Sequence, residues 1–308
     1  MDTKFNSKSD VYDYMEDNMF TCKFRGTPHE FLPRSHLETV TGKSTIERVV
    51  KGDDLIMLNS RELSVFVEQV HLHGRRLFAI CVYCDISMGA LKVMVDNGLT
   101  DTRLPLGNDD FGSLDRHRGI VKVFTANQKH FNTAFFLENR IQELDDRISY
   151  RSIPIDFEEC PANFKGRGAF GEVWKVKIHP DHRGFSCRTN ENSQFAMKVT
   201  QHEGREQNYH RAMAGLNHPH LVKCLASFTM GTKYQMVYEL ANCDLELFIQ
   251  RNPVASKVPG LTTPWLAQQL AGLAGALQVV HNPDGSEPHR MSNSLSVPLA
   301  NVTKTGVS

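Results

Sequence analysis

The sequence predicts an α+β protein, with a mainly helical domain first and a small antiparallel sheet with accompanying helices second. Residues 44–97 repeat apolar side chains at steps of three and four, the period of an amphipathic helix. From residue 171 to residue 240 the apolar residues come instead in short β-branched and aromatic runs separated by turns, which is typical of strands. We therefore expect four segments: an irregular stretch over 1–42, a helical domain over 43–150, a sheet-containing domain over 155–281 and a disordered tail over 282–308.

The charge balance and the cysteines narrow the class of protein. Lys plus Arg and Asp plus Glu both number 35, so the formal net charge is zero, and we expect no broad binding to nucleic acid or to an anionic membrane. Seven scattered cysteines favour reduced thiols in the cytoplasm or the nucleus. Cys81 and Cys84 form the one CxxC, but they lie in an apolar helical run and are expected to be core thiols. The N-terminus lacks the apolar core of a signal peptide.

The first half is expected to be helical. Helices are predicted over 60–84, 87–98 and 125–147, with a loop over 99–112. Gly98 suits the C-terminus of the second helix. No catalytic spacing occurs in this half, which we interpret as a scaffold or docking domain.

The second half is expected to form the sheet. Strands are predicted over 171–178, 194–200, 222–229 and 233–240, with one helix inserted before the third strand. Helices then follow over 244–251 and 263–281, the latter with one apolar stripe made of Leu266, Leu270, Leu273, Leu277 and Val280.

Three glycines mark a candidate phosphate site. Gly166, Gly168 and Gly171 give the pattern G-x-G-x-x-G, which lets backbone amides approach phosphate oxygens without interference from a Cβ atom. A dinucleotide site would need a helix after the loop, whereas here "EVWKVKI" continues as a strand. The pattern therefore favours a hairpin lid over phosphates.

Lys198, in "FAMKV", is the second candidate. A lysine that faces inward on a strand is costly to bury without a partner. It either extends to the edge of the sheet or meets an anion such as a phosphate.

In chain order, the glycine-rich loop, "AMK", "LNHPHLVK" and "MVYEL" resemble the N-terminal lobe of a eukaryotic-type protein kinase, over about Ile155 to His281. "HPHLVK" and the polar insertion over 179–193 are similar to kinase-domain proteins of filamentous fungi. The resemblance implies a small lobe with two helices of the large lobe, ATP as the bound nucleotide, and Mg2+ as its metal.

The resemblance also implies roles for matching residues. The loop of Gly166, Arg167, Gly168, Ala169, Phe170 and Gly171 would cover the phosphates, Val173 and Ala196 would enclose the adenine, and Lys198 would hold the α- and β-phosphates. Tyr238 would stand at the back of the pocket, with the backbones of Glu239 and Ala241 at the adenine edge. Asp244 would bond a ribose hydroxyl or, equally, serve as the N-cap of the next helix.

The sequence departs from the family at two points. The family register places Tyr209 where a kinase has the glutamate that pairs with the lysine; Glu206, one turn earlier, either reaches Lys198 or is solvated. After His281 no catalytic loop and no Asp-Phe-Gly follows, since the nearest string, "HRM", puts Met291 where the base belongs. The base and the Mg2+ ligands are thus missing from these 308 residues.

We therefore expect a truncated protein-kinase-like chain whose parent activity is phosphoryl transfer from ATP to a protein Ser or Thr hydroxyl. As written, it is expected to be inactive, because the transition-state charge stays unneutralised. The alternative is a non-catalytic pseudokinase-type binding or scaffold protein. A non-functional product of an altered or mispredicted splice is a third interpretation, and the protein partner is unknown.

Overall fold

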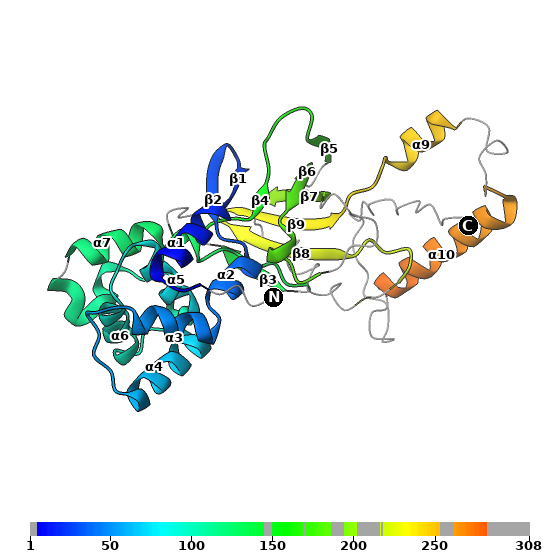
Figure 1. Cartoon of the computed structure of the whole chain (residues 1–308). Coiled ribbons are helices and arrows are strands. Elements are labelled where there is room, and N and C mark those ends of the chain that lie inside the picture. The colour runs from blue at the N-terminus through cyan, green and yellow to red at the C-terminus, as the bar shows by residue number, and fades with distance from the viewer. Residues whose placement is uncertain are drawn as a thin grey trace. The chain divides into compact units, whose positions relative to one another are not determined.

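The computed structural model describes residues 5–116, 118–138, 140–144, 150–168, 171–185, 194–201, 216, 218–252 and 261–281 (Figure 1). The chain divides into two compact units. The first comprises residues 1–135, 144–159 and 177–184, and the second comprises residues 136–143, 160–176 and 185–308. The fold is a mixture of α and β structure.

Helices dominate the first unit and enclose one apolar core. Its helices and strands are α1 (Lys8–Asp17), β1 (Phe20–Phe24), β2 (Thr27–Phe31), α2 (Arg34–Val40), α3 (Lys43–Lys51), α4 (Ser60–His73), α5 (Arg75–Tyr83), α6 (Met88–Asp96), α7 (Arg118–Asn127) and β4 (Ile155–Asp156). Short 3-10 turns lie at Asp101–Arg103, Asn108–Arg116, Gln128–His130 and Pro180–His182.

Residues 5–42 are ordered secondary structure, so the expectation of an irregular segment is wrong there. Ser7 and Asp10 form a capping box that starts α1. β1 and β2 pair as a hairpin whose two turn residues, Arg25 and Gly26, both have positive φ, at 51° and 77°. Such a turn matches the natural twist of the two strands, so the hairpin forms without an Asn-Gly or Asp-Gly signal.

The helical run expected over 60–84 is two helices. α4 begins at a capping box of Asn59 and Glu62 and ends at Gly74. The Asp101 carboxylate then accepts hydrogen bonds of 3.0 and 3.1 Å from the backbone N–H groups of Arg76 and Leu77, at the start of α5. A distant side chain thus satisfies amides that a new helix leaves free.

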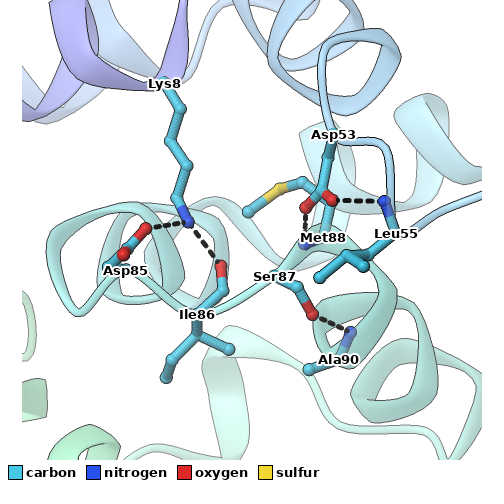
Figure 2. Close-up of polar contacts among 8 residues, drawn as sticks. All are labelled: Lys8, Asp53, Leu55, Asp85, Ile86, Ser87, Met88 and Ala90. Carbon is cyan, nitrogen blue, oxygen red and sulfur yellow. Dashed lines mark hydrogen bonds and ion pairs between the residues drawn. The ribbon is translucent and has the colours of Figure 1, made fainter.

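Side-chain bonds tie the loops of the first unit to its helices, as Figure 2 shows. Lys8 Nζ donates to Asp85 Oδ1 at 2.7 Å and to the carbonyl of Ile86 at 3.0 Å. Asp53 accepts from the backbone N–H groups of Leu55 and Met88. These bonds fix the loops on either side of α4 and α5 by satisfying backbone groups that have no helical partner.

The second unit is built on one sheet. Its elements are β3 (Ile141–Leu144), β5 (Phe164–Gly168), β6 (Gly171–Ile178), β7 (Gln194–Gln201), β8 (Cys224–Met230), β9 (Lys233–Glu239), α9 (Leu245–Arg251) and α10 (Thr263–His281), although Leu144 and the last two residues of β6 belong to the first unit. The strands follow the order β3-β8-β9-β7-β6, and β5 pairs with β6. The four expected strands and both later helices are confirmed; the helix expected to be inserted before β8 lies outside the described residues.

The prediction of a helix over residues 125–147 is wrong. α7 ends at Asn127, and Ile141–Leu144 is strand β3, next to β8 in the sheet. The aromatic ring of Phe136 lies 5.2 Å from that of Phe228 on β8, and the side chain of Lys223 pairs with Glu138. Pairing with an open strand edge satisfies backbone groups that a helix would have satisfied internally, so tertiary contacts override the local period.

Candidate functional site

The glycine pattern forms a hairpin of β5 and β6. Gly168 pairs with Gly171 and Gly166 pairs with Val173, with a bulge between Phe164 and Gly166. A Cβ atom added at Gly171 would lie 2.2 Å from the carbonyl oxygen of Val199 on β7, so only glycine fits there. An added Cβ at Gly166 or Gly168 would meet nothing within 4 Å. Two glycines thus border open space, while the third permits close contact with β7.

The two faces of this hairpin carry different side chains. Directly paired residues point to the same face and successive residues alternate. Arg167 therefore shares a face with Glu172, its partner, and with Trp174, whereas Val173 points to the opposite face. The side chains of Arg167 and of Val173, the expected adenine contact, thus lie on opposite faces of the hairpin. Ala169 and Phe170 lie outside the described residues.

Strands β7 and β9 bring three predicted site residues together. These two strands are neighbours in the sheet (Figure 1). Ala196 pairs with Tyr238, and Lys198 pairs with Met236, so these four side chains share one face of the sheet. Ala196, Lys198 and Tyr238 are all half-buried. On the opposite face most side chains are buried, namely Phe195, Met197, Ala226, Phe228, Gln235 and Val237, while Val199 and Glu239 are half-buried. On the Lys198 face, Met236, Ser227 and Thr200 are buried, and Ala196, Lys198 and Tyr238 are among its partly exposed side chains.

Cys224, which sequence reasoning missed, borders Tyr238 on this face. It pairs with Tyr238 across β8 and β9. Burial raises the pKa of the Cys224 thiol to about 12, and the thiol donates to the carbonyl of Ala226 at 3.2 Å. Cys224 is therefore a neutral packing residue at neutral pH. Tyr238 Oη donates to Met236 Sδ at 3.3 Å, which orients the ring.

The expected glutamate partner of Lys198 is not placed. Glu206, together with Glu203 and Tyr209, lies outside the described residues, so its pairing with Lys198 stays a prediction. Magnesium has no evident place either, since the described parts of the chain contain no group of three or more His, Cys, Asp or Glu side chains able to hold a metal ion.

The segment after β9 provides the remaining predicted residues. Glu239 ends β9 and is half-buried, while Ala241 and Asp244 are exposed. Asp244 Oδ1 accepts a 2.7 Å hydrogen bond from the backbone N–H of Leu247 and caps α9. The N-cap alternative is therefore realised in the structure, and a bond from Asp244 to ribose stays a prediction.

A turn at His218 and His220 contacts α10, and sequence reasoning missed this contact. His220 Nε2 lies 3.0 Å from Gln269 Oε1. A Cβ atom added at Gly272 would lie 2.2 Å from the His220 ring, and one at Gly275 would lie 3.3 Å from His218. The sequence signal for this contact is the pair Gly272 and Gly275, three residues apart in an apolar helix, because glycines in a helix often mark a close approach of another segment.

Comparison with known proteins supports a kinase-like domain. Residues 163–285 match the family model of protein tyrosine and serine/threonine kinases. No curated protein matches the chain. The matched range contains the glycine hairpin, Lys198, Tyr238 and both helices α9 and α10, so the second unit carries a protein-kinase-like domain. Among the helices described, none is long and apolar enough to cross a membrane.

Proposed function

We propose that the protein-kinase-like domain binds ATP between the glycine hairpin and the half-buried face of β7 and β9. The register of these two strands carries this proposal, because it puts the half-buried side chains of Ala196, Lys198 and Tyr238 on one face of the sheet. Ala196 leaves room for a flat adenine beside it, and Lys198 supplies a positive charge for the α- and β-phosphates. Gly166 and Gly168 border the open space that the phosphates need.

The parent reaction that fits this domain is transfer of the γ-phosphoryl group to a Ser or Thr hydroxyl. Its base and metal ligands do not occur in residues 282–308, which contain neither a catalytic-loop Asp and Asn nor Asp-Phe-Gly. We propose that the 308-residue chain binds ATP without transferring phosphate. Under this proposal the chain acts as a binding or scaffold protein in the cytoplasm or nucleus, as in the pseudokinase alternative.

Calorimetric titration of the full chain with ATP tests the nucleotide site. Lys198→Ala is expected to weaken ATP binding about tenfold or more, since a charge-assisted contact to phosphate contributes about 1.5–3 kcal/mol. Lys233→Ala, at the far end of β9 from Tyr238, is the matched control and should leave binding unchanged. Equal affinity for ATP in wild type and Lys198→Ala contradicts the proposed site.

Phosphate transfer is measured separately, with radiolabelled ATP, Mg2+ and a general protein substrate. We expect no label on the chain or the substrate above a blank without protein. Transfer that disappears in Lys198→Ala would contradict the proposed inactivity and leave the ATP site in place. The fungal likeness is tested by neither experiment and stays a prediction.

A further inference from the structure

Four side chains join the two strands of the glycine hairpin on the face away from Val173. Arg167 Nη2 pairs with Glu172 Oε1 across the hairpin, and Trp174 Nε1 donates to the other oxygen, Glu172 Oε2, at 3.2 Å. Phe164 packs edge-to-face on Trp174, with ring centroids 5.1 Å apart. The Glu172 carboxylate thus links Arg167 on β5 to Trp174 on β6. The aromatic pair of Phe164 and Trp174 forms a second contact between the two strands.

This cluster lies beside three glycines and a bulge. Gly166, Gly168 and Gly171 lose more conformational freedom on folding than other residues would. The bulge between Phe164 and Gly166 interrupts the regular pairing of residues between β5 and β6. Side chains that join β5 to β6 on both sides of the bulge therefore restrict the twist of the segment whose amides face the proposed phosphates.

We propose that Phe164, Arg167, Glu172 and Trp174 form an outer clamp, and that Glu172 and Trp174 are positioning residues for phosphate binding. The proposal rests on the proposed ATP site. The clamp acts through the backbone, because its side chains lie on the opposite face from Val173. It holds the N–H groups of the hairpin in a conformation that accepts the phosphates and lowers the entropy lost on binding.

The clamp should affect nucleotides with phosphates and spare those without. An exposed ion pair contributes little by itself, and the side chain of Arg167 is 72% exposed. Because Glu172→Ala also removes the hydrogen bond to Trp174, we expect this variant to weaken ATP binding about three- to tenfold, the range given by one or two modest contacts. Adenosine makes no phosphate contact, so its affinity should change less than twofold.

The test uses the full chain and three variants. Glu172→Ala removes both bonds of the carboxylate, while Glu172→Gln keeps an oxygen for Trp174 and loses the charge. Glu138→Gln breaks an ion pair at the β3 and β8 edge and serves as the control for loss of a surface pair. We expect the ATP affinity to fall in the order wild type, Glu172→Gln, Glu172→Ala, with Glu138→Gln equal to wild type.

A second readout needs no nucleotide. Hydrogen exchange of the described hairpin amides, 164–168 and 171–174, should become about fivefold faster in Glu172→Ala, with exchange in β8 and β9 unchanged. In a Trp265→Phe background, the emission of Trp174 should shift to longer wavelength in Glu172→Ala, because the indole gains contact with water when the carboxylate is removed.

The binding and hydrogen-exchange measurements test the clamp and the ATP site as separate hypotheses. Faster hairpin exchange with a selective loss of ATP affinity supports the clamp as a positioning device. Equal losses for ATP and adenosine, or unchanged hairpin exchange, overturn it. If the wild-type chain binds neither ATP nor adenosine, the proposed ATP site is wrong. The positioning role of the clamp in phosphate binding is then wrong as well, even if hydrogen exchange shows that the four side chains stabilise the hairpin.

Discussion

Helices α5 and α10 are both apolar but differ in how much of their surface the fold covers. In α5, six consecutive residues from Leu77 to Val82 are buried, each at most 1% exposed. In α10, only Ala276 and Val280 are buried, while Leu266, Leu270 and Leu277 are 52%, 59% and 44% exposed. An apolar sequence therefore predicts that a helix exists, whereas the elements packed around it decide whether its side chains leave water.

Replacing the largest buried side chain of α5 should give the strongest effect. Phe78 is fully buried, so Phe78→Ala is expected to lower the free energy of unfolding by about 3–5 kcal/mol through lost apolar burial and a cavity. Leu270→Ala, on the exposed face of α10, should cost less than about 1 kcal/mol. Urea unfolding of the full chain measures both. Similar losses for the two variants would remove the contrast between the helices.

Acid should weaken the first unit through a buried histidine. Burial lowers the pKa of His182 from 6.5 to about 4, although its Nδ1 lies 3.1 Å from the carbonyl oxygen of Ala134. The unfolded chain thus binds the proton more readily, so stability is complete above about pH 6.5 and falls by on the order of 3 kcal/mol as the pH approaches 4. Burial lowers the pKa values of His29, His130 and His179 in the same direction.

The measurement for His182 is urea unfolding at pH 7 and pH 4.5. His182→Asn keeps a group that can bond Ala134 and loses the titration, so its stability should depend less on pH than that of wild type. His73→Asn, at an exposed position in α4, is the control and should keep the wild-type pH dependence. Parallel pH curves for wild type and His182→Asn would show that His182 is not the sensor.

The glycine hairpin gives a matched pair within the second unit. Gly171→Ala places a Cβ against the carbonyl of Val199 at a residue with φ of 140°, and should destabilise this unit by about 2 kcal/mol or more. Gly168→Ala meets nothing within 4 Å and should be nearly neutral for folding. We expect Gly168→Ala to weaken ATP binding instead, as measured by calorimetry. A stable Gly171→Ala variant would contradict the close contact with β7.

The smallest expected effect concerns Asp244. Asp244→Ala should destabilise α9 by about 1 kcal/mol because the Leu247 amide loses its cap. Asp244→Asn keeps the cap and loses the charge. Helix content by circular dichroism and ATP affinity by calorimetry then separate the two roles: weaker ATP binding in both variants supports the ribose contact, and normal binding in Asp244→Asn leaves the cap as its role.

Much of the second unit could be predicted because its signals are local. The strand runs at 171–178 and 233–240 appear as β6 and β9 almost residue for residue, since turns and β-branched residues mark their ends. The residues of the candidate site were predicted from the order of the motifs along the chain. The face on which the Arg167 side chain lies could not be predicted, because the bulge after Phe164 shifts the alternation of side chains along β5.

The sequence by itself determined the elements that depend on neighbours along the chain: the capped helices, the glycine hairpin and the alternation that puts Ala196 and Lys198 on one face. Only the tertiary structure decided that Ile141–Leu144 is a strand and that α10 keeps three leucines exposed. The physical reason is that caps and turns satisfy backbone groups locally, whereas strand pairing and burial depend on partners distant in sequence.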